Sequence, residues 1–275
     1  MFNWLELSNP VALWWIFLIS VAVINICAWF FTLKYLSHGQ NIKAVKVLIF
    51  LSACYVFGCA FRSFLPRADV QRICLFDTWF SCVFLGRSVA TIAEIAFVAQ
   101  WALVLHRVSI LTQTEIAEKL SLLIVPLIVT AECFSWYAVI TTHYLGNTCE
   151  ESLWTVTYFL ITICLAAIYP KLKGALKFAA GLAAIGCLFY IAFMTTVDVP
   201  MYFTRWQNDS HNGKVLLGFF DGIRDLNTRW VVTRNIADWK TEIPWMSLYF
   251  STAVWTSIML CYVPLTKERF LKHLK

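Results

Sequence analysis

The chain has 275 residues, of which 60% are hydrophobic and only 14% are charged. Soluble domains have about 25% charged residues, so this composition excludes a soluble globular protein and favours a membrane-embedded one. The net charge of +6 is less informative than its distribution over the connections between apolar stretches, and nothing in the sequence predicts a nucleic-acid partner.

Seven apolar stretches are each long enough to cross a bilayer, which takes about 20 helical residues. They cover residues 10–33, 44–61, 78–106, 120–142, 152–169, 175–199 and 244–263. Prolines fall at the ends of several stretches, among them Pro200 after the sixth, and Pro126 inside the fourth predicts a kink. Thirteen Trp and ten Tyr suit the aromatic belts of a membrane protein. The sequence therefore predicts an all-α polytopic membrane protein, with residues 1–275 forming a single seven-transmembrane helix bundle.

The third stretch is unusual because it carries Arg87, Glu94 and Gln100. Arg87 and Glu94 are seven residues apart, which places them on one face of a helix. An unpaired charge at the bilayer centre costs about 2.5–3.5 kcal/mol on insertion scales. This face is therefore expected to point into the bundle, either as an internal ion pair that fixes packing or as part of a polar pocket or ion path.

Basic residues set the expected orientation of the bundle. With seven spans, the side that holds the first, third and fifth connections and the C-terminus has a clear excess of Lys and Arg over Asp and Glu. The positive-inside rule then places the C-terminus in the cytoplasm and the N-terminus outside or in a lumen.

Acid–base-capable side chains collect at the outer ends of the later stretches and are expected to line one cavity that opens to the non-cytoplasmic side. A histidine among several carboxylates can act as a general acid–base set or hold a metal. The catalytic candidates are Glu94, Glu132, His143, Glu150 and Asp198. Arginines suited to holding a substrate phosphate or carboxylate are Arg62, Arg87 and Arg205. The alternative for the charges between the fourth and fifth stretches is an ordinary solvated loop. No spacing is diagnostic of a metal ligand set, so the sequence predicts no metal site and identifies no cofactor.

The outer connections contain two further features. Cys74 and Cys149, with Cys82 as a rival, could form a disulfide in an oxidising compartment. The last connection, residues 201–243, contains an apolar repeat at helical spacing over Lys214–Val232, with Asp225 and Arg229 spaced for an ion pair. This pattern predicts an amphipathic helix that lies on the membrane surface or caps the bundle.

No family is assigned from the sequence. Seven spans invite comparison with rhodopsin-like receptors, but His106–Val108 replaces the triplet after the third span, and the seventh span has no NPxxY and no lysine. The histidine pattern of alkaline ceramidase-like hydrolases is also missing.

Three functions remain open. The first is a protein that binds or acts on a lipid or lipid-linked substrate through a charge-lined pocket. The second is a transporter or receptor that uses Arg87, Glu94 and Glu132 for binding or proton coupling. The third is a non-catalytic membrane subunit or assembly factor. Membrane lipids are the expected partners in all three.

Overall fold

The computed structural model describes residues 9–37 and 43–263, and the regular secondary structure of this part is helical apart from three two-residue strands. It divides into two compact units. Of the described residues, unit 1 comprises 9–37, 43–97 and 224–262, and unit 2 comprises 98–223 together with Val263. Helices α3 (Val83–Leu111) and α9 (Phe219–Thr228) pass from one unit into the other.

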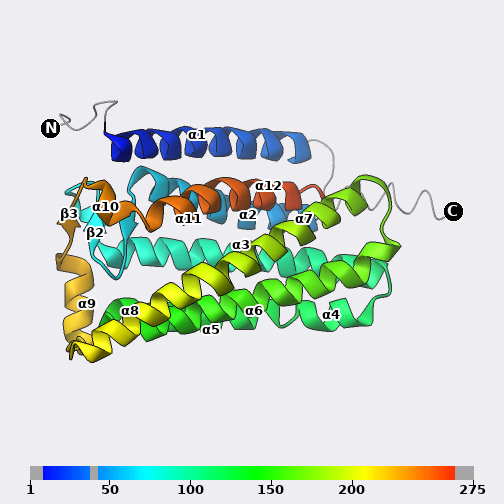
Figure 1. The fold of residues 1–275 in the computed structure, drawn as a ribbon. Coiled ribbons are helices and arrows are strands. Elements are labelled where there is room, and N and C mark those ends of the chain that lie inside the picture. The colour runs from blue at the N-terminus through cyan, green and yellow to red at the C-terminus, as the bar shows by residue number, and fades with distance from the viewer. Residues whose placement is uncertain (1–8, 38–42, 264–275) are drawn as a thin grey trace. The chain divides into compact units, whose positions relative to one another are not determined.

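Unit 1 is built on α1 (Pro10–Ser37), α2 (Lys43–Phe64), the first part of α3, and a helical run made of α11 (Glu242–Leu248), the π-helical segment η4 (Tyr249–Ala253) and α12 (Val254–Leu260). Helix α1 packs against α2 and α12, and α2 packs against α12 (Figure 1). Side chains of α1 are apolar on both sides: Leu18 is buried whereas Phe31 is 68% exposed. A helix that stays apolar where it faces outward is typical of a membrane span.

A small sheet closes one end of unit 1. Strand β2 (Ile73–Cys74) pairs with β1 (Arg67–Ala68) in antiparallel fashion and with β3 (Val231–Val232) in parallel fashion. The short helices η1 (Trp79–Ser81) and α10 (Ile236–Trp239) complete this cap, and Trp239 is fully buried in it. The connection after α2 and the last long connection therefore fold together, although the paired residues Ile73 and Val231 are 158 positions apart in the chain.

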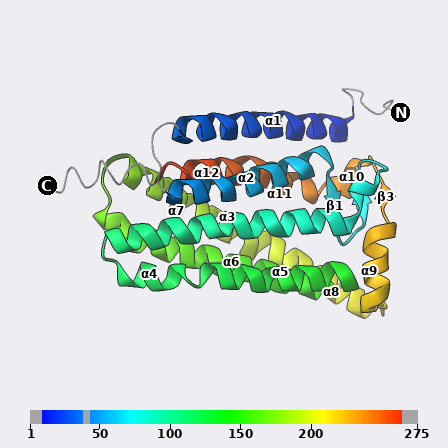
Figure 2. The same cartoon turned by 180° about the vertical axis from the view of Figure 1, so that it is seen from behind.

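Unit 2 is organised around α6 (Tyr144–Ile168), which packs against α4 (Glu115–Ser121), α5 (Ile124–Thr141), α7 (Gly174–Phe193) and α8 (Val199–His211). Helices α5 and α6 lie side by side in both views (Figures 1 and 2). They form a tight hairpin because Thr142 adopts a left-handed conformation with φ +60°. The 3₁₀ segment η2 (Tyr169–Lys171) leads into α7.

Proline residues shape two helices of unit 2 in different ways. The fourth stretch, where a kink is expected, is interrupted between α4 and α5 at Leu122–Leu123. Leu122 lies four residues before Pro126, which has no N–H to bond the Leu122 carbonyl. The expectation that Pro200 ends the helix of the sixth stretch is wrong. The π-helical segment η3 (Met194–Asp198) lies directly before it, and the helix continues as α8 to His211. A π segment already breaks the regular bonding pattern, so the missing proline N–H is accommodated there.

Six helices of the described chain are long and apolar enough to cross a membrane: Pro10–Leu36, Ala44–Phe64, Val83–Leu111, Glu115–Thr141, Tyr144–Lys171 and Gly174–His211. The chain is thus a multi-pass membrane protein. The seventh predicted span, residues 244–263, is helical as α11, η4 and α12 but is not among the six. Five Ser and Thr residues lower its hydropathy: Ser247, Ser251, Thr252, Thr256 and Ser257.

Two sequence boundaries need correction. The region from Tyr144 to Glu151, expected to be a loop, forms the first two turns of α6. The surface helix expected over Lys214–Val232 is shorter, and only Phe219–Thr228 is helical. Both chain termini, residues 1–8 and 264–275, lie outside the described residues, so the predicted orientation of the ends rests on the sequence.

Candidate functional site

The ion pair expected on the third stretch forms within α3. The Nη2 atom of Arg87 donates to Glu94 Oε2 at 2.8 Å, and both side chains are buried. Their seven-residue spacing turns both toward the same side of the helix. The internal pair that the sequence suggested is therefore present.

Arg87 belongs to a larger group in unit 1 that we call the arginine cluster: Arg62, Arg67, Arg72 and Arg87. Each of the four is at most 6% exposed, although arginine is seldom buried without a partner. Three of them have a carboxylate partner in unit 1, namely Asp69 for Arg67 at 2.9 Å, Asp225 for Arg72 at 2.8 Å, and Glu94 for Arg87. Within the described part of the chain, Arg62 forms no ion pair.

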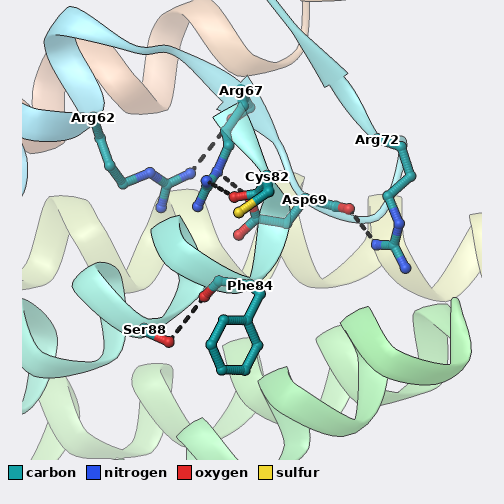
Figure 3. Close-up of polar contacts among 7 residues, drawn as sticks. All are labelled: Arg62, Arg67, Asp69, Arg72, Cys82, Phe84 and Ser88. Atoms are coloured by element: carbon teal, nitrogen blue, oxygen red, sulfur yellow. Dashed lines mark hydrogen bonds and ion pairs between the residues drawn. The ribbon is translucent and has the colours of Figure 1, made fainter. Parts of the chain in front are cut away.

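The guanidinium of Arg67 lies against Gly86 in the first turn of α3. Its Nη1 donates to the Cys82 carbonyl at 2.5 Å and its Nε to Asp69 (Figure 3). A Cβ built on Gly86 would lie 1.4 Å from Nη2 of Arg67. The third nitrogen, Nη2, is buried and has no hydrogen-bond partner among the described residues. Gly86 therefore provides the space in which this guanidinium sits.

Arg62 approaches Arg67 from the last turn of α2. Its Nη2 donates to the Arg67 carbonyl at 3.4 Å, and Figure 3 shows the two guanidinium groups turned toward each other. The guanidinium also lies over the Trp245 ring at 5.5 Å. Its Nε is buried with no partner among the residues that the structure covers. Two adjacent guanidiniums with unused N–H donors form a local excess of positive charge that favours a bound anion.

Electrostatic effects at Asp69 agree with this excess. Burial by itself raises the pKa of the Asp69 carboxyl, but the guanidiniums of Arg67, Arg62, Arg87 and Arg72 outweigh burial, so the pKa lies below its ordinary value. Burial also lowers the pKa of Arg67 to about 10, and the Asp69 carboxylate limits that decrease. Arg67 remains charged at neutral pH.

The last connection covers the cluster through Asp225 of α9. This carboxylate bonds Arg72 through Oδ2 and Arg229 through Oδ1, the latter at 2.9 Å, which confirms the Asp225–Arg229 pair expected from the helical spacing. The Arg72 Nη1 donates to the Asp69 carbonyl at 2.5 Å. Arg72 itself adopts φ +59°, which turns the chain between β1 and β2.

In unit 2, two of the predicted acidic residues come together. Glu132 of α5 and Glu150 of α6 are 3% and 4% exposed, and their carboxylate oxygens approach within 4.8 Å. The Asn147 Nδ2 donates to Glu150 Oε2 at 3.2 Å. We call Glu132 and Glu150 the carboxylate pair. The alternative of a solvated loop is thus wrong for Glu150, because the helix begins at Tyr144 and turns this side chain inward.

The other predicted residues of unit 2 have different surroundings. His143, at the start of α6, pairs through Nδ1 with the Tyr137 hydroxyl at 3.0 Å. Partial burial, followed by the charge of Lys214, lowers the pKa of His143. Arg205 of α8 lies over the rings of Tyr144 and Tyr202, at 5.6 Å from each.

Asp198 lies within the π segment of a 38-residue helical run, about 24 residues from its start at Gly174. The structure thus brings Arg62 and Arg87 into unit 1 and puts Arg205 in unit 2.

Cys74, Cys82 and Cys149 are free thiols in the structure. Cys74 belongs to unit 1 and Cys149 to unit 2, so the disulfide between them stays a prediction. The Cys74 thiol donates to the Phe76 carbonyl at 3.3 Å inside the cap, and burial raises its pKa.

Sequence reasoning did not single out Arg67, Asp69 and Asn147 as site residues. For Asn147 a signal existed, since it precedes Glu150 by three residues and so shares its helical face. For Arg67 the only local signal was a loop arginine, a residue type that is usually solvated.

Comparisons with protein-family models, with curated protein sequences and with solved structures found no match for this chain.

Proposed function

We propose that this integral membrane protein binds the phosphate group of an anionic lipid or lipid-linked molecule at the arginine cluster, on the non-cytoplasmic side. The observation that carries the proposal is the pair of adjacent buried guanidiniums, Arg62 and Arg67, each with an N–H that has no described acceptor. An unsatisfied buried donor costs about 1–3 kcal/mol, so two of them favour a ligand that accepts both.

Phosphate suits this site better than a neutral ligand. Guanidinium groups hold phosphate oxygens through paired, charge-assisted hydrogen bonds. The cluster has four guanidiniums, and three are matched by Asp69, Asp225 and Glu94. An anion at Arg62 would neutralise the remaining charge.

A lipid is the favoured source of the phosphate. The connection that carries Arg67 and Arg72 exposes Trp79 and Phe80, at 60% and 55%, and Phe64 at the end of α2 is also exposed. Aromatic side chains at the end of a span are typical of the headgroup region of a bilayer. A headgroup phosphate would thus be available next to Arg62, which is in the last turn of α2.

The orientation in this proposal requires the helical run Glu242–Leu260 to be a seventh span. That run is about 28 Å long at 1.5 Å per residue, close to the hydrocarbon thickness of a bilayer. Some of its polar groups bond other helices of unit 1: Asn25 of α1 donates to the Phe250 carbonyl at 2.8 Å and accepts from Trp255 at 2.8 Å. Ser257 bonds Ser52 of α2. Part of the polarity that lowers the hydropathy of the run is therefore used in contacts with other helices. Protease protection of a C-terminal epitope tag in sealed vesicles tests the resulting cytoplasmic C-terminus.

Binding alone is proposed, without a reaction. Within the described residues, His143 contacts Tyr137 and none of the carboxylates predicted to act with it in unit 2, namely Glu132, Glu150 and Asp198.

Lipid binding can be measured by native mass spectrometry of the full-length protein in mild detergent, with added phosphatidylglycerol or phosphatidylcholine. Wild-type protein is expected to retain phosphatidylglycerol preferentially. Replacing one charge-assisted hydrogen bond, worth about 1.5–3 kcal/mol, should weaken retention about 10- to 100-fold in Arg62→Gln. Because Arg62 has no carboxylate partner, its neutralisation should leave the protein folded.

Arg229→Gln is the matched control, since Arg229 contacts the same cap through Asp225 but is 57% exposed. It should retain lipid as wild type does. Equal retention by Arg62→Gln and wild type, or no preference for phosphatidylglycerol, would overturn the proposal. The same measurement is repeated with inorganic phosphate added as a competitor. If phosphate displaces phosphatidylglycerol as well as added lipid does, the ligand is free phosphate and the lipid assignment is wrong.

A further inference from the structure

We propose that the carboxylate pair of unit 2, together with Asn147 and Ser135, binds a divalent metal cation of the hard, oxygen-preferring class that includes Ca²⁺ and Mn²⁺. All four residues lie on α5 and α6. The sequence predicted no metal here.

The first argument is the proximity of two buried acids. Glu132 and Glu150 are at least 96% buried, and their oxygens lie within 4.8 Å of each other. In a low-dielectric interior, two ionised carboxylates at this distance repel each other strongly. A divalent cation between them would offset this repulsion.

The second argument comes from two neutral oxygens with no described donor or acceptor. The amide of Asn147 is fixed by the bond from its Nδ2 to Glu150, so its Oδ1 lies beside that carboxylate, and this Oδ1 is buried without a partner among the described residues. Asn147 as a whole is 7% exposed. An amide oxygen held beside a carboxylate without a hydrogen bond is suited to a metal ion.

Ser135 of α5 supplies a second buried oxygen without a described hydrogen bond. Every other Ser and Thr hydroxyl on α5 and α6 donates to the carbonyl four residues back: Thr130, Thr141, Thr148, Ser152, Thr155, Thr157 and Thr162. The Ser135 hydroxyl is buried and, within the described chain, makes no such bond. It lies three residues after Glu132 and so on the same helical face.

The spacing of the four residues is regular. Glu132 and Ser135 on α5, and Asn147 and Glu150 on α6, are both i,i+3 pairs. Bundle metal sites are commonly built from inward-facing pairs of this spacing on neighbouring helices. Ser135 and Glu150 are about equally far from the turn that joins the helices, so they lie at a similar level, roughly 11 Å below the turn.

Close helix packing holds the two pairs together. A Cβ on Gly146 would lie 2.9 Å from the Phe134 carbonyl and 2.8 Å from Ala138 Cβ, so only glycine allows this approach of α6 to α5. Gly146 directly precedes Asn147. The donor oxygens are thereby fixed by the backbone, as a preorganised ion site requires.

The ligand chemistry identifies the class of ion. The four side chains offer carboxylate, amide and hydroxyl oxygens, with a combined charge of −2 when both acids are ionised. Oxygen ligands of this kind suit Ca²⁺, Mg²⁺ and Mn²⁺, whereas Zn²⁺ prefers sulfur and nitrogen. A divalent ion matches the charge.

The test uses the full-length protein, purified in mild detergent and freed of metal with a chelator. Thermal unfolding is measured with Ca²⁺, Mg²⁺ or Mn²⁺ added, and bound metal is counted by elemental analysis. Wild type is expected to bind one ion per chain and to unfold at a higher temperature as the ion concentration rises. Glu132→Gln should lose the metal-dependent shift, while the control Glu115→Gln, whose side chain is 86% exposed on α4, should keep it.

Ser135→Ala and Asn147→Ala keep the test decisive if Glu132→Gln fails to fold. Both remove a neutral oxygen, and each should weaken metal affinity about tenfold or more. The proposal is overturned if wild type shows no metal-dependent shift. It is also overturned if the shift persists in Glu132→Gln, or if both alanine variants bind the ion as tightly as wild type. A pair that only shares a proton would give the first of these results.

Discussion

Replacing Gly86 with alanine should displace the guanidinium of Arg67 although no charged residue is substituted. The new Cβ would lie 1.4, 1.6 and 1.8 Å from three guanidinium atoms of Arg67. Ordinary carbon contacts need at least about 3.5 Å, so the group must retreat by roughly 2 Å. Its bond to the Cys82 carbonyl cannot survive that movement, and the pair with Asp69 is strained.

The magnitude follows from these two contacts. Hydrogen bonds to charged groups contribute about 1.5–3 kcal/mol each, and the gain in helix propensity from glycine to alanine is at most about 1 kcal/mol. Gly86→Ala should therefore lower the free energy of unfolding by roughly 1–3 kcal/mol. Thermal unfolding followed by tryptophan fluorescence in detergent should show a decrease of several degrees. Because Arg67 is displaced, retention of phosphatidylglycerol should fall as well.

Gly186→Ala in α7 is the matched control, because a Cβ there has no atom within 4 Å. It should leave the unfolding temperature unchanged or raise it slightly. A double-mutant cycle with Arg67→Ala isolates the contact: once the guanidinium is gone, alanine at Gly86 should cost little. Additive effects of the two substitutions would refute the argument, as would a Gly86→Ala protein that unfolds at the wild-type temperature.

Three further predictions concern other contacts. Glu94→Gln removes the carboxylate that pairs with the buried guanidinium of Arg87, so the unfolding temperature should fall by more than it does for an exposed Glu→Gln change. An unchanged unfolding temperature would show that the pair does not contribute to stability. Gly222→Ala places a Cβ 2.2 Å from the Ile140 carbonyl, so the start of α9 should detach and become sensitive to limited proteolysis; protection equal to wild type would contradict this. The lowered pKa of His143 means that the unfolded state binds more protons at mildly acid pH. The contribution of neutral His143 to the free energy of unfolding is therefore complete above about pH 6.5, near the pKa in the unfolded state. This contribution is lost as the pH falls through the lower pKa of the folded state. Unfolding temperatures of wild type should drop more on acidification than those of His143→Gln, and parallel curves would reject this role.

The local features of the sequence allowed part of this structure to be predicted. The seven-residue spacing of Arg87 and Glu94 was sufficient to place them on one face, and Pro126 was sufficient to predict an interrupted helix. The pair between Asp225 and Arg229 followed from helical spacing in the same way. In each case the cause and the effect lie within two helical turns.

Contacts between distant segments were beyond such reasoning. Arg67 is buried because residues 224–239 fold back onto this connection and β3 pairs with β2. The sequence around Arg67 contains no signal that predicts this long-range contact. Glu150 was assigned to a loop because the polar run Asn147–Ser152 hides the helical periodicity of α6. The continuation of the helix past Pro200 depends on the π segment before it, whose presence the sequence pattern does not reveal.

Glycine, more than charge, explains how these polar groups become buried. A guanidinium or an amide inside a membrane protein needs partners at hydrogen-bonding distance, and a neighbouring backbone can approach most closely at a glycine, which has no Cβ. Gly86 opens that space for Arg67, and Gly146 lets α6 approach α5 beside Asn147. By contrast, Gly186 faces open space and adjoins no buried charge. The two glycines thus determine where the arginine cluster and the carboxylate pair can form, and the charged side chains determine which ions these sites would accept.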